Sequence, residues 1–295
     1  MIIVNLYGGL GNQLFQYACG KAVAERLGVE LQLDISHLKE YGKATNFTVR
    51  DFELGVFSIN EKTADIQEVR KYVPNLYKTS RYYHQLWRIK RLFNGRHLFI
   101  ERTWQRDRYI ENIEKVKDNT YLYGYFQSAR YFADIEEKLR TTLVLKDRID
   151  AENEALIQQM ENENSVSIHI RRGDYENSRF SLPELDTYYL PAIKAIQTQI
   201  PQPKFYIFSN DAEWVKKNFN SLEIKNEIVS INSGSRSFMD MILMSRCKHN
   251  IIGNSSFSWW GAWLNQNPDK MIVVPKNWYK NGRETDLQLK EWIKI

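Results

Sequence analysis

Short apolar segments alternate with helix-like segments through the second half of the chain. The apolar segments lie at 166–170, 204–208, 227–231, 250–252 and 271–274, and the helical patterns lie between them at 186–200, 211–219, 237–245 and 256–264. Strands that alternate with helices of this length are typical of a parallel sheet covered by crossover helices. The sequence therefore predicts a doubly wound parallel α/β domain, an architecture that binds nucleotides.

The first half begins with a similar unit. We expect strands at 1–6, 30–34 and 121–126 and helices at 14–27 and 129–139. A chain of 295 residues suits about two domains, and a polar, helix-like stretch at 147–163 lies where we place the connection. We therefore predict an N-terminal α/β domain over 1–150 and a C-terminal domain over 151–295, with a last helix able to pack back on the first domain.

Composition narrows the class of protein. Hydrophobic residues make up 43% of the chain, which indicates a globular protein. The net charge of +5 suits an anionic small ligand or a membrane surface, but it is too small to indicate nucleic acid. No run of about 18 apolar residues occurs, and the N-terminus lacks the basic start of a signal peptide. Cys19 and Cys247 read as reduced core thiols, so we expect a cytoplasmic protein.

Two arginines stand directly after the apolar segment 166–170. Arg171, Arg172, Gly173 and Asp174 follow one another at a point where an open parallel sheet places its ligands. Guanidinium groups offer forked donors that suit phosphate oxygens. The alternative is that one arginine pairs with Asp174 and the other is a solvated surface charge. The position at a strand end before Gly-Asp favours anion binding.

Polar loops also follow three other expected strands. They are Gly8–Gln13, Ser209–Asp211 and Asn254–Trp260. If the three loops of the second half converge, they supply a guanidinium fork, a short carboxylate and a helix N-terminus with two hydroxyls. Such a set can hold a nucleoside diphosphate without a metal.

Each of these loops also has a structural interpretation. Asp211, Ser255 and Ser256 suit helix capping, and a cap can coexist with a ligand contact. The glycine-rich loop lets a ligand approach backbone N–H groups, or it is simply a tight turn that needs positive φ. Tryptophans 259, 260 and 263 recur at helical spacing, which favours core packing over a ligand platform.

Motifs for several other chemistries are absent from the sequence. No Asp-x-Asp occurs, so a metal-dependent sugar transferase is disfavoured. The five histidines show no zinc spacing, and the nucleophile elbow Gly-x-Ser-x-Gly is missing. We therefore expect no metal and no cofactor.

Residues 69–100 combine basic and aromatic side chains. The segment holds eight Lys or Arg residues and no acid, and helical spacing is plausible over 84–93. Three interpretations stay open: a solvated helix face, a peripheral contact with an anionic bilayer, and stacking of single-stranded nucleic acid. The solvated face is favoured, and we expect no nucleic-acid partner.

Four motifs together resemble those of glycosyltransferase family 11, the α-1,2-fucosyltransferases, in a bacterial form. They are Gly8-Gly-Leu-Gly-Asn-Gln-Leu-Phe-Gln-Tyr17, His169-Ile-Arg-Arg-Gly-Asp-Tyr175, Ser209-Asn-Asp211 and Asn254-Ser-Ser-Phe-Ser-Trp-Trp-Gly-Ala-Trp263. The resemblance implies a GT-B fold, in which two Rossmann-like domains face a cleft. It also implies metal-independent transfer of L-fucose from GDP-β-L-fucose, with inversion, to the 2-hydroxyl of a terminal β-galactoside.

The resemblance assigns the donor site to the second half of the chain. Arg171 would contact the diphosphate and stabilise the departing GDP, and Arg172 resembles the second arginine of the family. His169 and Asp211 would face guanine and ribose, and Ser255 with Ser256 would face the β-phosphate. The remaining donor-site residues in the matching motifs are Asn210, Asn254 and Phe257.

In the first half, the resemblance points to the glycine-rich loop. Asn12 would lie near the reacting centre, with Gly9, Gly11 and Gln13 in the loop at the cleft. Inversion needs a group that accepts the proton of the attacking hydroxyl, and Asp174 and Glu176 are both candidates.

The motifs indicate the donor substrate more specifically than the acceptor substrate. Alternatives are another linkage or another GDP-sugar, and a non-catalytic nucleotide-sugar or glycan binding module. The acceptor would be a surface-polysaccharide precursor, of which a lipid-linked oligosaccharide is one form, or a free galactoside. A lipid-linked acceptor would suit a peripheral position at the inner membrane face.

Overall fold

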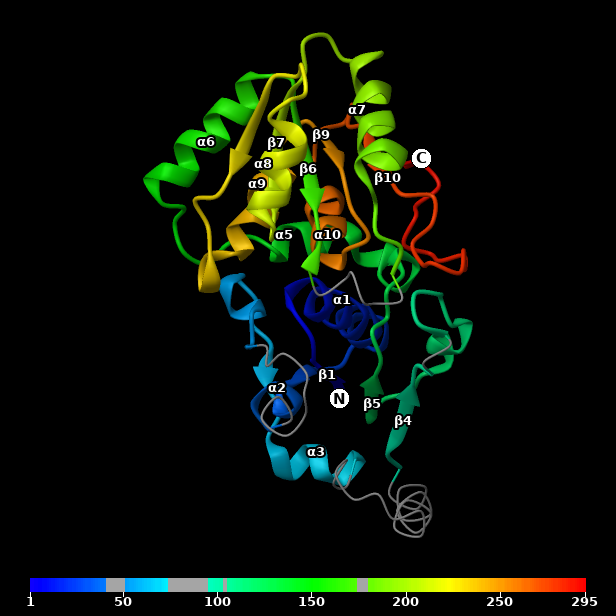
Figure 1. The fold of residues 1–295 in the computed structure, drawn as a ribbon. Coiled ribbons are helices and arrows are strands. Elements are labelled where there is room, and N and C mark those ends of the chain that lie inside the picture. The colour runs from blue at the N-terminus through cyan, green and yellow to red at the C-terminus, as the bar shows by residue number, and fades with distance from the viewer. Residues whose placement is uncertain (41–50, 74–94, 103–104, 174–179) are drawn as a thin grey trace. The chain divides into compact units, whose positions relative to one another are not determined.

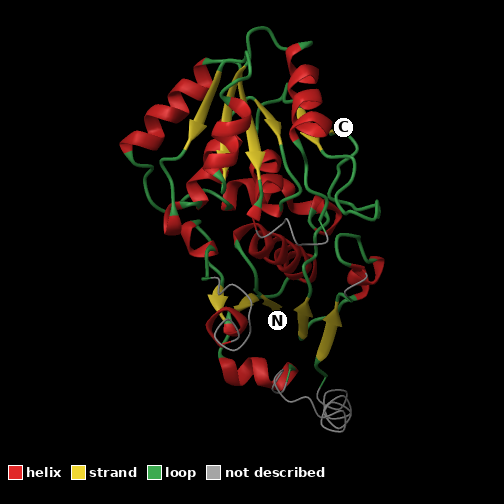
Figure 2. Ribbon diagram, in the orientation of Figure 1, coloured by secondary structure: helices red, strands yellow, loops and turns green. Residues whose placement is uncertain are grey.

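The computed structural model describes residues 1–40, 51–73, 95–102, 105–173 and 180–295 (Figure 1). The chain divides into two compact units, Met1–Lys146 and Asp147–Ile295. Each unit contains a sheet flanked by helices (Figure 2). The predicted helix over 84–93 lies outside the described residues, so that prediction stays open.

The first unit is built on a five-stranded parallel sheet with the strand order β3-β2-β1-β5-β4. Its strands are β1 (Ile2–Asn5), β2 (Leu31–Asp34), β3 (Lys62–Thr63), β4 (His97–Ile100) and β5 (Thr120–Tyr123). Its helices are α1 (Leu10–Leu27), α2 (Ser36–Glu40), α3 (Ile66–Tyr72) and α5 (Glu136–Thr142), with short 3₁₀ segments η2 (Leu54–Val56), η4 (Glu111–Lys115), η5 (Ala129–Tyr131) and η6 (Ala133–Ile135). β1 lies at the centre, and all four of its side chains are buried.

The second unit has a six-stranded parallel sheet with the order β11-β10-β9-β6-β7-β8. Its strands are β6 (Ser165–Ile170), β7 (Lys204–Ser209), β8 (Asn226–Val229), β9 (His249–Ile251), β10 (Ile272–Val274) and β11 (Ile293–Lys294). Its helical segments are α6 (Ala151–Asn162), the π-helix η8 (Leu185–Tyr189), α7 (Leu190–Gln197), α8 (Ala212–Phe219), η9 (Gly234–Arg236), α9 (Phe238–Arg246) and α10 (Ser256–Leu264). β6 lies between β9 and β7 and is buried along its whole length.

Most predicted elements of the second unit are confirmed within a few residues, and α10 has the predicted bounds. The reason is that its strands are short apolar runs and its helices begin at polar caps. Asp211 accepts a hydrogen bond from the Trp214 N–H, and Ser255 accepts one from the Phe257 N–H. Trp259, Trp260 and Trp263 are buried, as core packing requires.

Three predicted helices differ from the structure. α1 begins at Leu10, directly after the glycines. The segment 129–139 is not one helix, because Ser128 accepts from the Arg130 N–H and starts a 3₁₀ turn instead. The predicted last helix is wrong: residues 275–295 contain no helix, and β11 pairs with β10 in the sheet of the second unit. Trp292, with its ring 5.6 Å from that of Trp259, anchors this segment to the core of the unit.

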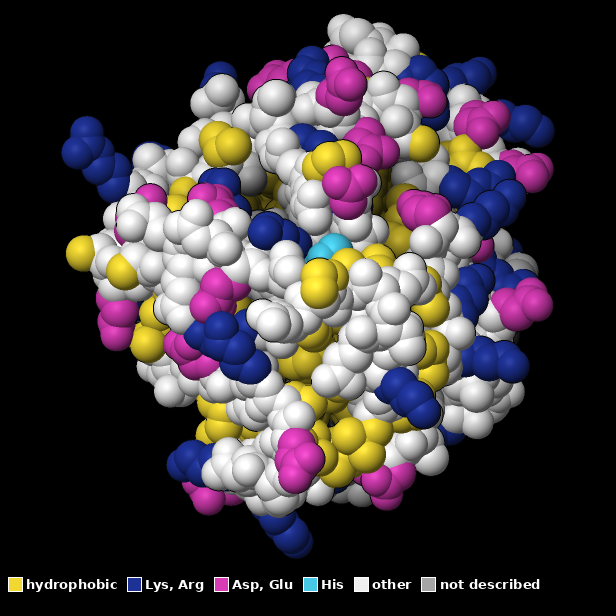
Figure 3. Space-filling model, turned by 90° about the horizontal axis from the view of Figure 1, so that it is seen from above, with side chains coloured by type: hydrophobic (Ala, Val, Ile, Leu, Met, Phe, Trp, Pro, Cys, Tyr) yellow, Lys and Arg dark blue, Asp and Glu magenta, His cyan; other side chains and the backbone are white. Residues whose placement is uncertain are grey.

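The thiols of Cys19 and Cys247 are both free and buried, as predicted. Within the described part of the chain, no helix is both long and apolar enough to cross a bilayer. The face that Figure 3 displays mixes Lys and Arg with Asp and Glu. That face therefore carries no field of a single sign.

Candidate active site

The carboxyl ends of β9, β6 and β7 lie side by side in the second sheet. Ile170 is paired with Ser209, and Ile168 is paired with Ile251, so the segments that follow these strands leave the same edge. The predicted loops at Arg171, Asn210 and Ser255 are thereby brought to one edge of one sheet. Parallel sheets place their ligands at this edge.

The backbone after β6 is held by Asn210. The Arg172 N–H donates to Asn210 Oδ1 at 3.0 Å, and Asn210 Nδ2 donates to the Arg172 carbonyl at 3.1 Å. Gly173 follows with a φ of +67°, which favours glycine. These bonds set the direction in which Arg171 leaves the strand.

The side chain of Arg172 lies among protein groups. Its guanidinium carbon lies 4.6 Å from the ring centroid of Trp214, and its Nη1 lies 3.6 Å from Glu184 Oε2. Only 13% of the side chain is exposed. Arg172 thus ties the end of β6 to α8 and η8, whereas the sequence suggested Asp174 as the acid that one arginine would meet. Asp174 itself lies outside the described residues.

His169 is the last polar residue of β6, and it is 6% exposed. Burial and the nearby charge of Arg171 lower the pKa of His169 to about 3, so the imidazole is neutral at pH 7. Its Nδ1 is buried and has no hydrogen-bond partner among the described residues. A buried polar atom in this state is available to a ligand.

The loop after β9 lies against His169. The ring of Phe257 is 5.9 Å from the imidazole, and a Cβ at Gly253 would lie 3.1 Å from the His169 carbonyl oxygen. Asn254 Nδ2 donates to the carbonyls of Ser181 at 2.7 Å and Asn277 at 3.1 Å, so Asn254 fixes the loop within the unit. Ser255 then begins α10.

The amino end of α10 completes this edge. The first N–H groups of a helix have no partner within the helix and carry partial positive charge, so they favour anions. Ser255 is almost buried and its hydroxyl caps the helix, whereas Ser256 is partly exposed on the first turn. Asp211 likewise uses Oδ1 to cap α8 at 2.9 Å from the Trp214 nitrogen. The predicted capping roles of Asp211 and Ser255 are therefore confirmed, whereas Ser256 is the first residue of α10 and not its cap.

In the first unit, the glycine-rich loop joins β1 to α1. Gly8 has a φ of +79°, and a Cβ there would lie 2.6 Å from Asn12 Nδ2, so the amide of Asn12 lies over this glycine. Asn12 Oδ1 accepts from Gln127 Nε2 at 2.8 Å. Gly9 is the N-cap residue of α1, and Gly11 lies in its buried first turn.

The side chain of Gln13 fixes the glycine-rich loop by hydrogen bonds. Its side chain is fully buried; Nε2 donates to the carbonyls of Gly8 and Asp51, each at 2.8 Å, and Oε1 accepts from the Glu53 N–H at 3.0 Å. Gln13 therefore keeps the glycine-rich loop against the segment at 51–53. Its amide is used by the protein itself.

Glu101 is a buried acid at the carboxyl end of β4 that no sequence pattern indicated. Glu101 stands directly after β4 and is 6% exposed. Burial raises the pKa of its carboxyl group to about 7, although hydrogen bonds from two backbone N–H groups and the charge of Arg106 act to lower it. The signal that could have found it is an acid immediately after an apolar strand. No recognised motif contains it.

Metal ligands do not gather in the described part of the chain. No group of three or more His, Cys, Asp and Glu side chains is placed there to hold a metal ion. The polar groups at the edge of the second sheet are instead donors: a guanidinium, hydroxyls and helix N–H groups. This donor set suits an oxyanion ligand.

A family model described as Glycosyl transferase family 11 matches residues 1–295. An α-1,2-colitosyltransferase of Escherichia coli is 30% identical over 305 residues, covering 100% of this chain and 99% of its own. An O-antigen biosynthesis glycosyltransferase of Escherichia coli, WbnK, is 30% identical over 304 residues, covering 98% and 99%.

More distant matches agree with these. Galactoside α-(1,2)-fucosyltransferase 1 of Lagothrix lagotricha is 24% identical over 159 residues, which are 48% of this chain and 42% of that protein. The crystal structure of NodZ α-1,6-fucosyltransferase soaked with GDP-fucose superposes with a TM-score of 0.54 at 17% identity, covering 89% of this chain and 91% of that one. The predicted α/β class with two parallel-sheet units, the GT-B type, is thereby confirmed.

Proposed function

Because the chain belongs to glycosyltransferase family 11, we propose that it transfers L-fucose from GDP-β-L-fucose to the 2-hydroxyl of a terminal β-galactoside, with inversion and without a metal. One observation carries the donor side of this proposal. Arg171, the neutral His169 and the amino end of α10 meet at one edge of the second sheet. These groups suit a nucleoside diphosphate.

The reaction would be a single displacement. The acceptor oxygen forms a bond to the anomeric carbon as the bond from that carbon to the β-phosphate oxygen breaks, and its electron pair leaves with GDP. Negative charge therefore grows on the diphosphate in the transition state, where Arg171 and the N–H groups of α10 would stabilise it. Ser255 and Ser256 would bind the β-phosphate.

The other donor-site residues would not contact the diphosphate charge directly. His169 and Asp211 would face guanine and ribose, with Phe257 beside the imidazole. Asn210, Arg172 and Asn254 are held by protein groups, so they would position the loops that carry the ligand contacts. Asp174 or Glu176 would accept the acceptor's proton, and Asn12 would lie near the reacting carbon.

Under this proposal the domain over 1–150 takes the acceptor and the domain over 151–295 takes GDP-fucose. A lipid-linked oligosaccharide is a proposed form of the acceptor, because a relative is named as an O-antigen glycosyltransferase. The cytoplasmic location and the peripheral contact through residues 69–100 also stay proposals. Flotation with anionic vesicles tests the membrane contact.

A second donor is favoured by one observation: a relative that is 30% identical over the whole chain is named as a colitosyltransferase. Colitose differs from fucose in lacking the 3-hydroxyl. A pocket that bonds this hydroxyl would reject the deoxy sugar strongly, whereas a pocket without such a bond would discriminate poorly. Competition between GDP-fucose and GDP-colitose at equal concentration decides between the donors.

The test is a product assay on the purified protein with GDP-fucose, methyl β-galactoside and EDTA. We expect a fucosyl galactoside whose NMR spectrum shows an α linkage to the 2-position. GDP binding by calorimetry without any transfer to a panel of β-galactosides would instead indicate a binding module. A product with a different linkage would retain the donor and overturn the proposed acceptor position.

A further inference from the structure

The turn after β5, residues Gly124–Gln127, is held by a buried carboxylate. The Tyr125 N–H donates to Glu101 Oε2 at 2.6 Å, and the Phe126 N–H donates to Glu101 Oε1 at 3.1 Å. Glu101 can reach both because β4 and β5 are neighbours, with Ile100 paired to Tyr123. One side chain thus satisfies two successive N–H groups of the turn.

The backbone of the turn is also tightly constrained. A Cβ at Gly124 would lie 2.5 Å from the Cβ of Glu101 and 2.9 Å from the ring of Phe126. Phe126 has a φ of +53°, which is unfavourable for a bulky residue. Such conformations persist where the surrounding structure enforces them, and they cluster at functional sites.

The turn presents two partly exposed side chains beside the glycine-rich loop. Tyr125 contacts the ring of Tyr7 at 4.6 Å, with the guanidinium of Arg106 over it at 4.3 Å. Gln127 donates to Asn12 Oδ1 at 2.8 Å. An aromatic ring, a guanidinium and two amides therefore lie in the segments that follow β1, β4 and β5, at the carboxyl edge of the first sheet.

We propose that Tyr125, Gln127 and Asn12 form the subsite for the acceptor hexopyranoside. This inference rests on the proposed function, and it names the residues that take the galactoside. The ring would pack on the apolar C–H face of the sugar, and the two amides would bond its hydroxyls, as in other small-molecule sites. Glu101 would act as a positioning residue, because it touches the turn and not the sugar.

Arg106 does not block this use of the ring. It comes from the loop after β4, and a cation–π contact at a partly exposed site is weak. A neutral sugar can therefore replace the guanidinium on Tyr125.

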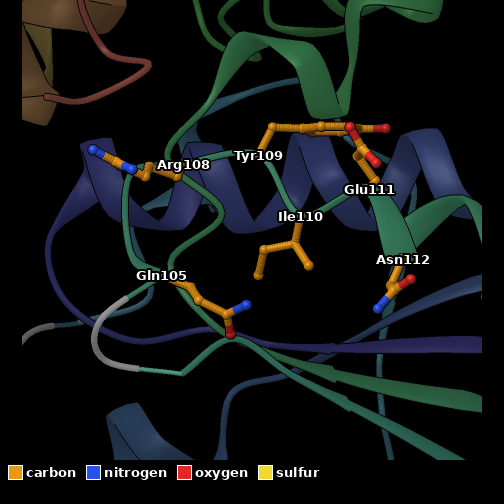
Figure 4. A pocket seen from close by; sticks show the side chains of 6 residues that line it. All are labelled: Gln105, Arg108, Tyr109, Ile110, Glu111 and Asn112. Carbon is orange, nitrogen blue, oxygen red and sulfur yellow. The ribbon is translucent and has the colours of Figure 1, made fainter.

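The same unit provides a matched control. Gln105 and residues 108–112 line a pocket of about 390 Å³, where Arg108 and Tyr109 extend to opposite sides of the loop (Figure 4). Tyr109 has ring neighbours of the same kind as Tyr125: the guanidinium of Arg130 lies 4.2 Å from its ring, and the ring of Tyr131 lies at 4.9 Å. Its hydroxyl differs in bonding to Glu114 Oε1 at 2.6 Å. The neighbours of Tyr109, namely Glu114, Arg130 and Tyr131, lie outside the glycine-rich loop.

The experiment compares Tyr125→Ala, Gln127→Ala and Tyr109→Ala by initial rates against methyl β-galactoside and GDP-fucose. Both Tyr125→Ala and Gln127→Ala are expected to raise the acceptor KM about tenfold while the donor KM changes less than about twofold. Tyr109→Ala should leave both constants near the wild-type values. Folded variants at positions 125 and 127 with the wild-type acceptor KM would overturn the subsite, as would a loss confined to Tyr109→Ala.

A binding assay separates this inference from the proposed function. If the wild type transfers no sugar, saturation-transfer NMR with methyl β-galactoside still reports the subsite. A signal in the wild type and in Tyr109→Ala that is lost in Tyr125→Ala supports the subsite without any turnover. A signal that persists in both Tyr125→Ala and Gln127→Ala, or no signal in the wild type, overturns it.

Discussion

Arg172 and Asn210 exchange two hydrogen bonds across the carboxyl ends of β6 and β7, at 3.0 and 3.1 Å. Both use the backbone of Arg172 and the side-chain amide of Asn210. The guanidinium of Arg172 extends from the same residue to Trp214 and Glu184. Arg172 therefore fixes the loop that follows β6, and the orientation of the preceding Arg171 depends on these contacts of Arg172.

Asn210→Ala should slow turnover through the position of Arg171. We expect kcat to fall about tenfold to a hundredfold, since a small misplacement of a group near the chemistry is costly. The free energy of unfolding should fall by about 1 kcal/mol, because two exposed hydrogen bonds are lost and water replaces the missing partner. Rates and urea unfolding measure the two effects.

Asn162→Ala is the matched control for this change. Asn162 is likewise exposed and donates its amide to a backbone carbonyl, that of Gln158, but on α6, away from the ends of β6 and β7. Its kcat should equal the wild-type value. If Asn210→Ala also turned over at the wild-type rate, the two hydrogen bonds between Arg172 and Asn210 would have no part in catalysis.

Arg171→Ala should nearly abolish turnover while the protein stays folded. Removal of one preorganised donor to a developing anion costs about a hundredfold to a thousandfold in kcat. Arg236→Ala removes a guanidinium of the same unit that pairs with Asp150 at 2.8 Å and is half exposed, so its kcat should not change. Single-turnover rates and circular dichroism measure this; a kcat within threefold of wild type would remove Arg171 from the mechanism.

His169 should make the protein less stable as the pH falls. Its pKa is near 6.5 in the unfolded chain and about 3 in the folded protein, so below 6.5 the unfolded state binds the extra proton. The free energy of unfolding should therefore drop by up to about 1.4 kcal/mol per pH unit from this group alone. The measurement is urea unfolding of wild type and His169→Gln from pH 7 to 5; parallel curves would contradict the assignment.

Glu101 should have the opposite pH dependence. Its pKa is about 7 in the folded protein against an ordinary value of 4.5, so the unfolded chain releases its proton first as the pH rises. The stability that Glu101 contributes is fully present below about pH 4.5 and is lost on the way to pH 7 and above. Arg106 and Asp107 face this carboxyl with opposite effects on its pKa.

Glu101→Gln tests this sign, because it removes the titrating group at a position of the same size. The difference in free energy of unfolding between wild type and variant should change between pH 5 and pH 7.5, with wild type losing stability relative to the variant. Glu161→Gln serves as the control, since Glu161 is a half-exposed acid that pairs with Arg246. A Glu101→Gln difference that stays constant over this range would show that the carboxyl does not titrate there.

Local patterns in the sequence were sufficient to predict most of the second unit. Alternating apolar residues gave β6 and β7, Ser255 gave the start of α10, and the spacing of Trp259, Trp260 and Trp263 gave its buried side. These features depend on neighbours within about one turn or one strand, so they are visible along the chain. The four motifs that indicated the family are likewise short stretches that can be recognised along the sequence.

Only the tertiary structure decided how distant side chains are used. Glu101 reaches the turn at Tyr125 because β4 and β5 are adjacent, and Asn210 reaches Arg172 because β6 and β7 are adjacent. The C-terminal segment became β11 because an edge of the sheet beside β10 was open to it. Strand order and packing determine such contacts between residues far apart in sequence, and no local periodicity records them.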